Sequence, residues 1–161
     1  MAADQVTIGI ADMKIIRQTG TLITYALGSC IGICIYDPVL HLAGMIHIML
    51  PGIPKSGDNK ILKYADSGIA ETLKQMEKLG GSRARFTAKI AGGAKMFDVP
   101  GESAVGGIGM RNIVATKTIL RSYNIKLMGE DTGLNYARTM LFEAATGKVV
   151  VRSYSKPDRV L

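Results

Sequence analysis

Apolar residues alternate with polar or small ones along four short segments in the first third of the chain. These segments are Val6–Ile10, Leu22–Ala26, Ile31–Tyr36 and Ala43–Leu50. A period of two residues is typical of strands that bury one face. The turn-forming residues of Pro51–Lys60 then end this run of predicted strands.

Two later segments have apolar residues at helical spacing. Within Ile61–Leu79 they recur every three or four positions, and Gly80 and Gly81 end the predicted helix. The glycine-rich loop Asp98–Met110 leads into a second predicted helix, Arg111–Tyr123. The remaining predicted elements are a strand in Arg83–Gly93, a strand in Ile125–Asp131, and a hairpin in Thr139–Tyr154 that turns near Thr146 and Gly147.

Two helices and about seven strands, mostly in hairpins, predict an α+β fold. We expect mixed or antiparallel sheets in a sandwich-like arrangement of layers, flanked by helices. Parallel α/β architecture is disfavoured because the helices do not alternate regularly with the strands. A chain of 161 residues can bury a sizeable core, so residues 1–161 are interpreted as one domain.

The composition and the cysteine spacing indicate in which cellular compartment the protein is expected. Apolar residues make up 47% of the chain, which argues against disorder, and no apolar segment is long enough to span a membrane. The N-terminus lacks the pattern of a signal peptide, so a cytoplasmic location is expected. Cys30 and Cys34 lie four residues apart on one predicted strand, too far for a disulfide, so both are expected as free thiols.

The net charge of +7 favours acidic partners. Nucleic acid is a poor candidate, because the basic residues are dispersed and no aromatic residues interleave them as stacking platforms. An acidic protein surface fits equally well, and so does a basic surface with no specific partner. Neither nucleic-acid binding nor membrane insertion is expected.

The candidate chemistry lies in the stretches "TYALGSCIGICIYD" and "MIHIML", which contain Cys30 and His47. One interpretation is a buried thiol and a buried imidazole without chemical function, which fits Cys34 between two isoleucines. A zinc site would use Cys30, Cys34, His41 and His47, but their spacing does not match the usual zinc motifs. The third interpretation is a nucleophile with its base.

Local features support that third interpretation. Gly28 and Ser29 before the thiol allow a tight turn, in which backbone N–H groups can face a developing oxyanion. If Ile31–Tyr36 pairs with Ala43–Leu50, His47 is predicted opposite Ser29 or Cys30, within reach of the thiol proton. Cys30 would then be partly exposed, with its pKa lowered by an imidazolium.

Several motifs together resemble the chemoreceptor glutamine deamidase family, CheD. They are "TYALGSCIGICIYDP", "GMIHIMLP", "KYADSGI", "AKIAGGAKMF", "GIGMRN" and "EDTG", in this order. The resemblance covers roughly Val6–Arg152 and implies that Cys30 is the nucleophile and His47 the general base and acid. Thr24 matches the family position that orients the imidazole; the alternative is an ordinary strand threonine on the face of Leu22 and Ala26.

One motif departs from the family pattern. The family usually has a second glycine after "DTG", whereas this chain has Leu134. A glycine there would matter if the position needs a positive φ or lies against a substrate backbone. Structural roles are therefore expected for Thr132, Gly133 and Arg138.

The resemblance also implies the activity: hydrolytic deamidation of glutamine side chains on the cytoplasmic helical bundle of chemotaxis receptors, with glutamyl methyl ester hydrolysis as a related reaction. It implies no metal and no organic cofactor, and it implies a CheC-type phosphatase as a second partner. A non-catalytic adaptor that binds receptors and the phosphatase is the alternative. The loop Pro51–Asn59 is expected to contact a partner, and the loop Asp98–Gly107 to lie near the site.

Overall fold

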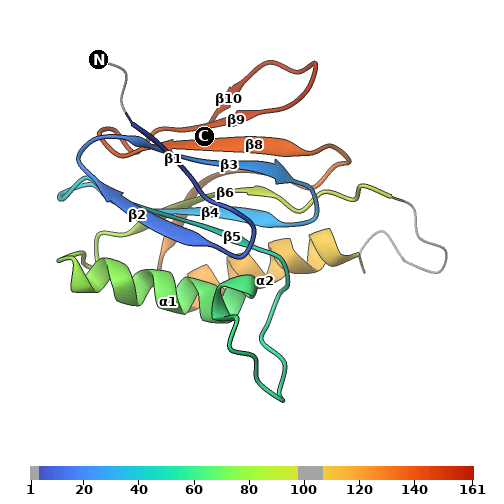
Figure 1. Ribbon diagram of the computed structural model, residues 1–161, viewed down its shortest axis with the longest axis horizontal. Coiled ribbons are helices and arrows are strands. Elements are labelled where there is room, and N and C mark those ends of the chain that lie inside the picture. The colour runs from blue at the N-terminus through green and yellow to red at the C-terminus, as the bar shows by residue number, and fades with distance from the viewer. Residues whose placement is uncertain (1–3, 98–106) are drawn as a thin grey trace.

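The structure is a computed structural model that describes residues 4–97 and 107–161, and its described strands form two five-stranded sheets (Figure 1). The first sheet has the order β1-β3-β8-β9-β10, with β1 Gln5–Thr7, β3 Thr21–Leu27, β8 Arg138–Glu143, β9 Val149–Arg152 and β10 Arg159–Val160. The second has the order β2-β5-β4-β6-β7, with β2 Met13–Arg17, β5 Leu42–Ile48, β4 Ile31–Asp37, β6 Thr87–Gly92 and β7 Lys126–Thr132.

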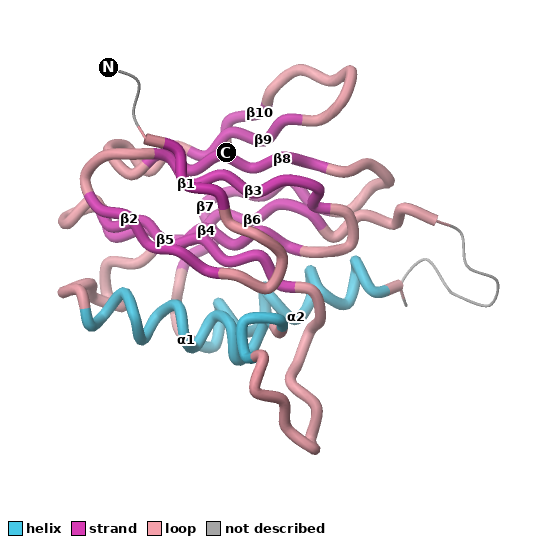
Figure 2. The backbone as a smooth tube through the Cα atoms, in the orientation of Figure 1, coloured by secondary structure: helices cyan, strands magenta, loops and turns pink. Residues whose placement is uncertain are grey.

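The elements stack in three layers, with the first sheet on the second sheet and the helices beneath (Figures 1 and 2). The helices are α1 Ala65–Lys78, α2 Ile108–Ser122 and the short 3-10 helix η1 Ile61–Lys63. Both α-helices cover the outer face of the second sheet. The predicted α+β class, with sheets in a sandwich-like arrangement flanked by helices, is confirmed.

Strand β4 shows how the sequence makes these layers. Its isoleucines Ile31, Ile33 and Ile35 point to the helices and join one core, whereas Cys34 and Tyr36 point to the first sheet and join the other. Because side chains alternate along a strand, a strand that is apolar on both faces can be buried on both sides. All seven residues of β4 and of β5 are buried accordingly.

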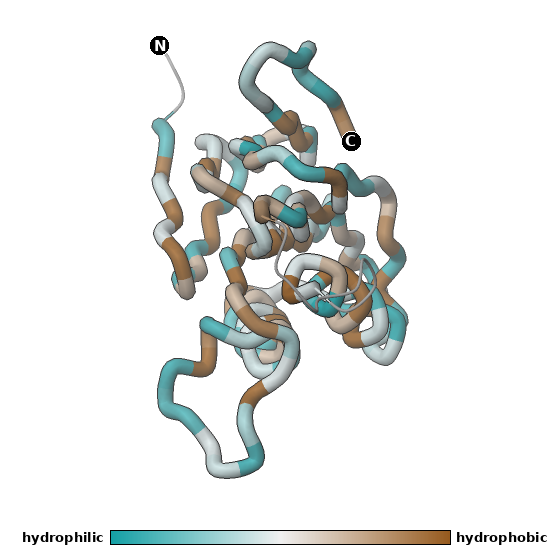
Figure 3. Tube along the Cα trace, turned by 90° about the vertical axis from the view of Figure 1, so that its right-hand side faces the viewer, coloured by the Kyte–Doolittle hydropathy of each residue, from teal (hydrophilic) through white to brown (hydrophobic). Residues whose placement is uncertain are grey.

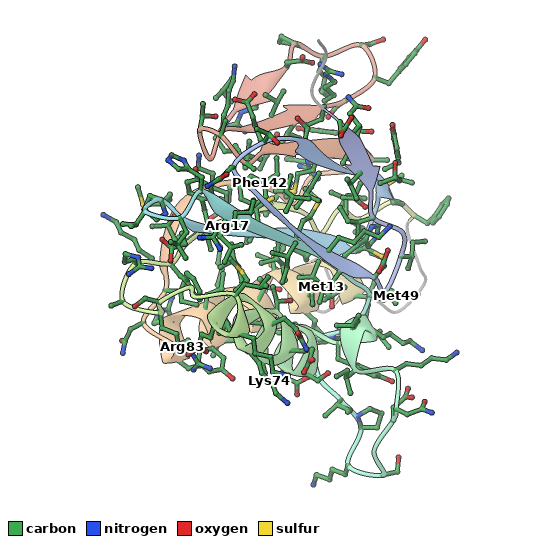
Figure 4. All side chains as sticks on the ribbon, turned by 60° about the vertical axis from the view of Figure 1, so that its left-hand side comes forward. Met13, Arg17, Met49, Lys74, Arg83 and Phe142 are labelled. Carbon is green, nitrogen blue, oxygen red and sulfur yellow. The ribbon has the colours of Figure 1, made fainter. Side chains whose placement is uncertain are left out.

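Apolar side chains fill most of the space between the sheets, and few charged side chains of the described residues are buried; these are Asp37, Asp131 and Arg138. In Figure 4, Phe142 of β8 lies between the two sheets, whereas Lys74 on α1 reaches into solvent. In Figure 3, the segment that projects below the helices is mostly hydrophilic; it is the loop between β5 and η1. No described helix is long and apolar enough to cross a membrane.

The sequence misplaced some elements. The expected strand Val6–Ile10 is only the three residues of β1, and β2 and β10 were not foreseen. Pairing is also less local than expected, because β1 with β3 and β6 with β7 are parallel pairs. Edge strands such as β2 show less alternation than central ones, since fewer of their residues are buried.

Candidate active site

Cys30 lies in the turn between β3 and β4, and the segment that follows β6 holds this turn with two backbone hydrogen bonds. The Gly93 N–H donates to the Cys30 carbonyl at 2.9 Å, and the Ala94 N–H donates to the Gly28 carbonyl at 2.8 Å. A side chain at Gly92 would collide with the Cys30 carbonyl, and its φ of 116° also favours glycine. Neither cysteine forms a disulfide. The Cys30 side chain is half-buried, whereas that of Cys34 is buried.

His47 lies in β5, in a register that differs from the expected one. It pairs with Gly32, not with Ser29 or Cys30, so the prediction was wrong by at least two residues. The face is nevertheless the right one, because residues two apart on a strand point to the same side. His47 therefore faces the first sheet from a position diagonal to Cys30, and its side chain is fully buried.

Thr24 of β3 hydrogen-bonds to His47 across the gap between the sheets. Its Oγ1 lies 2.7 Å from His47 Nδ1 and 2.9 Å from the Ile8 carbonyl oxygen. A carbonyl can only accept, so the single Thr24 hydroxyl proton is donated to Ile8, and the Thr24 oxygen accepts from Nδ1–H. This assigns the proton to Nδ1 and leaves Nε2 with a free lone pair.

A bulge in β3 interrupts its inward-facing residues after Thr24. A register shift between Thr24 and Leu27 interrupts its pairing with β8, and Ala26 adopts a φ of 56° there. Ala26 is consequently exposed, so the expected face shared by Leu22, Thr24 and Ala26 ends at Thr24. The bulge turns the chain toward the Cys30 turn.

The titration of the two groups differs from the expectation. Burial lowers the pKa of His47 to about 4, and burial is also the largest effect on Cys30, whose pKa is raised although its own backbone N–H lowers it. The predicted lowering of the Cys30 pKa by an imidazolium is therefore wrong. At neutral pH the pair is a thiol and a neutral imidazole, with no described residue bonded to Nε2.

The residues before Cys30 have distinct contacts. The Gly28 N–H donates to the Ala26 carbonyl at 3.0 Å, so Gly28 supports the turn. The Ser29 carbonyl accepts from the side chain of Asn112 at 2.9 Å. Asn112 was not singled out from the sequence, although it ends the quoted motif "GIGMRN"; only its buried position on α2 reveals the contact.

The "DTG" segment packs against the end of β6, next to Gly93, whose N–H donates to the Cys30 carbonyl. Arg138 is buried, donates to the Gly133 carbonyl at 2.9 Å and pairs with Asp131 at 3.2 Å. The Gly133 N–H donates to the Gly92 carbonyl at 2.9 Å. Thr132 hydrogen-bonds to Glu130 at 2.7 Å. The contacts of all three residues are thus structural ones.

Leu134 does occupy a position with a positive φ, 59°, where a leucine is strained. Its side chain is 65% exposed and lines a pocket of about 300 Å³ beside Ser29. Met96, Phe97 and Met110 line the same pocket. The surface next to the nucleophile turn is therefore apolar.

The four residues of the zinc interpretation do not converge. Cys34, in the middle of β4, contacts Met140, whereas His41 hydrogen-bonds to Tyr36 toward the end of β4 away from Cys30. No group of three or more histidine, cysteine or acidic side chains in residues 4–97 and 107–161 could hold a metal ion.

The structure describes one of the two loops that were expected near the site or a partner, and only one residue of the other. The Pro51–Asn59 loop leaves β5 close to the site and projects away from the sheets, beyond the helices (Figure 1). Of the Asp98–Gly107 loop, only Gly107 is among the described residues, and it lines the pocket beside Ser29.

A half-exposed thiol beside a turn, near an imidazole with a free lone pair and a hydroxyl that fixes its tautomer, has the components that thiol-dependent acyl transfer requires. The profile of the family described as "CheD chemotactic sensory transduction" matches residues 49–153. Relatives match nearly the whole chain. A "Probable chemoreceptor glutamine deamidase CheD" of Syntrophomonas wolfei is 44% identical over 158 residues, covering 97% of this chain and 98% of its own.

The protein of the same name from Clostridium novyi is 42% identical over 162 residues and covers both chains fully. That of Caldanaerobacter subterraneus is 44% identical over 147 residues, 91% of each chain. The chain belongs to the CheD family. The family profile begins after His47, so it is the full-length relatives whose match includes Thr24, Cys30 and His47.

Proposed function

We propose that this protein is a chemoreceptor glutamine deamidase, a protein-glutamine glutaminase that hydrolyses glutamine side chains of chemotaxis receptors to glutamate and so tunes receptor signalling. The proposal is carried by one observation: the Thr24 hydroxyl accepts from His47 Nδ1–H, which leaves Nε2 as the basic nitrogen. The strand register puts His47 on the same face of the second sheet as Cys30. The name shared by its relatives supplies the substrate class.

In the first step, His47 Nε2 takes the Cys30 proton while the sulfur attacks the carboxamide carbon. A general base is needed here because the raised pKa of Cys30 leaves little thiolate at neutral pH. The low pKa of His47 keeps the imidazole neutral, so Nε2 has a lone pair that can accept the proton. The distance to the thiol is expected to shorten when substrate binds, as catalytic hydrogen bonds commonly do.

The amide oxygen becomes negative as the carbon–sulfur bond forms. Gly28 donates elsewhere, so the backbone N–H groups of Ser29 and Cys30 are the proposed donors to this oxyanion, with Gly28 shaping the turn. The carbon–nitrogen bond then breaks as His47 returns the proton to the departing nitrogen, releasing ammonia and leaving a thioester on Cys30. Thr24 holds the imidazole through both transfers.

Water deprotonated by His47 then attacks the thioester carbon, and the thiol leaves with the proton, yielding glutamate and free Cys30. A glutamyl methyl ester would react in the same way, with methanol as the leaving group. The proposed mechanism uses the side chains of Cys30, His47 and Thr24 and needs neither a metal nor an organic cofactor.

The relatives' name supports a chemotaxis receptor as partner, and the location and the second partner are further parts of the proposal. We place the reaction on the cytoplasmic helical bundle of the receptor, in the compartment where free thiols such as Cys30 and Cys34 persist. The apolar rim beside Ser29 would receive the substrate helix, and the net charge of +7 would favour an acidic one. A CheC-type phosphatase is the second proposed partner.

A non-catalytic adaptor is the competing function. It predicts receptor binding without ammonia release, whereas the deamidase predicts both. Incubating the protein with a purified receptor cytoplasmic fragment separates them: ammonia release, and a mass gain of about 1 Da per converted glutamine, are expected from wild type and absent from Cys30→Ala. Binding without either change would support the adaptor.

A further inference from the structure

The side chain of Asn112 connects the two halves of the candidate site. Its Nδ2 atom lies 2.9 Å from the Ser29 carbonyl oxygen and 2.9 Å from the Met49 carbonyl oxygen. Ser29 directly precedes Cys30, and Met49 is the second residue after His47. Figure 4 places Met49 where β5 leaves the sheet.

We propose that Asn112 is a positioning residue, whose amide clamps the nucleophile turn to the strand of the base and so sets the distance between Cys30 and His47. This inference rests on the proposed function. A single –NH₂ group has two hydrogens and can hold two acceptors at once, which a hydroxyl cannot. The need to donate to two carbonyls explains why an asparagine is suited to this position.

The orientation of the amide supports the clamp. Two backbone carbonyls can only accept, so the amide nitrogen must face them, and Oδ1 is left buried with no partner among the described residues. Leaving a buried oxygen unpaired costs free energy. A residue chosen for stability alone would avoid this cost, whereas a residue that must hold both carbonyls cannot.

Helix α2 is fixed against the same turn at a second point. Gly109 packs so closely on the strand end that a side chain there would collide with the Gly93 and Ala94 carbonyls. The N–H groups of Gly93 and Ala94 are the donors that hold Cys30 and Gly28. The first turn of α2 is thus a rigid support, and Asn112 extends from it to both parts of the site.

Losing the clamp should affect the chemical step more than binding. Asn112 is fully buried beneath the turn, so it cannot contact a protein substrate directly. A shift of about 1 Å between reacting groups can cost on the order of 100-fold in rate. For Asn112→Leu, similar in volume but without donors, kcat is expected to fall about 100-fold, with KM for the receptor fragment little changed.

Thr116 provides a matched control. It lies one turn further along α2, is equally buried, and its hydroxyl has no partner in the described part of the chain. Thr116→Val also replaces a buried polar side chain of α2 by an apolar one but breaks no described hydrogen bond, so it should leave kcat at the wild-type value. Asn112→Asp keeps the side-chain shape while removing the amide donors, and is expected to lower kcat as Asn112→Leu does. Asn112→Ser, smaller and with one donor, is measured if the other two variants do not fold.

The outcomes are distinguishable. A folded Asn112 variant with wild-type kcat, or one in which KM rises and kcat does not fall, overturns the clamp while wild-type ammonia release upholds the deamidase. An equal loss of kcat in Thr116→Val also overturns it, because general packing would then be the cause. A wild type without ammonia release overturns the proposed function and, with it, this inference.

Discussion

Two groups along β4 contain the same three kinds of side chain in different arrangements. The first, at the start of the strand, is Cys30, His47 and Thr24; the second has Cys34 in the middle of the strand and Tyr36 with His41 toward its other end. Each histidine has its Nδ1 atom beside a hydroxyl, at 2.7 Å for Thr24 and 3.0 Å for Tyr36. Each hydroxyl in turn donates to a backbone carbonyl, of Ile8 and of Ala144 respectively.

The two groups differ in which side chain is buried, the imidazole or the thiol. In the first group the imidazole is fully buried and the thiol is half-exposed. In the second group the thiol is buried and His41 is exposed in a turn. An oriented imidazole is therefore common to both groups and does not by itself make a site. A nucleophile must also be reachable by substrate and lie close to its base.

The largest expected effect concerns the two cysteines. Cys30→Ala should abolish ammonia release from a receptor fragment and leave the thermal midpoint nearly unchanged, because a half-exposed side chain in a turn contributes little packing. Cys34→Ala should retain activity and lose about 1 kcal/mol of stability from the small cavity between the sheets. The reverse pattern in these two assays would exchange their roles.

Alkylation gives a second measure of the same difference. Iodoacetamide should label Cys30 faster than Cys34, which is only 1% exposed. Because burial raises the pKa of Cys30, its labelling rate should keep rising with pH above 8. A rate that levels off near neutral pH would indicate a thiolate–imidazolium pair instead.

The histidines come next. His47→Ala removes the proposed general base and should lower kcat by about two to four orders of magnitude. His41→Ala, at the other end of β4, should leave kcat unchanged. Ammonia-release kinetics on both variants test the ranking, and wild-type turnover by His47→Ala would exclude a Cys30–His47 mechanism.

Removing the Thr24 hydroxyl should lower kcat, whereas removing the Tyr36 hydroxyl should not, and the effect should be smaller than for the histidines. Thr24→Val removes the acceptor for Nδ1–H, so the imidazole can adopt either tautomer. We expect kcat to fall about 10- to 100-fold, the effect of removing a group that orients a metal-bound histidine. Tyr36→Phe should leave kcat intact but lower the free energy of unfolding by about 1 to 2 kcal/mol, because the buried Ala144 carbonyl loses its partner. Thr24→Ser, which restores the hydroxyl, should recover most of the kcat.

The buried imidazole also predicts a pH dependence. His47 has a pKa of about 4 when folded, against an ordinary value of 6.5, so the unfolded chain binds the extra proton first as the pH falls. Stability from this residue is complete above about pH 6.5 and is lost between about 6.5 and 4, on the order of 3 kcal/mol. Denaturant unfolding at several pH values should show this loss in wild type and not in His47→Gln. For the same reason kcat/KM should decline near pH 4, not near 6.5.

The sequence predicted the central strands and Cys30, His47 and Thr24 as candidates, because alternating burial and a run of matching motifs are local signals. It could not predict the register, since a shift of two residues keeps every side chain of β5 on the same face. Nor could it predict the pKa directions, because these depend on burial by elements distant in the chain. Asn112 was missed for a similar reason: its two acceptors lie 83 and 63 residues away.

The smallest expected effect concerns the Pro51–Asn59 loop, which leaves the protein at the Cys30 end. Its tip carries the exposed Lys55, and Asp58 anchors its base through a 2.7 Å hydrogen bond from Tyr64. If the loop contacts an acidic receptor helix, Lys55→Glu should raise KM for the intact receptor about two- to fivefold, the range for one exposed charge pair. Lys74→Glu on the outer face of α1 is the control, matched in charge and exposure (Figure 4). Equal KM values for the two variants would show that the loop takes no part in receptor binding. A rise in KM confined to Lys55→Glu, and smaller at high salt, would show that the receptor docks at the Cys30 end of β4.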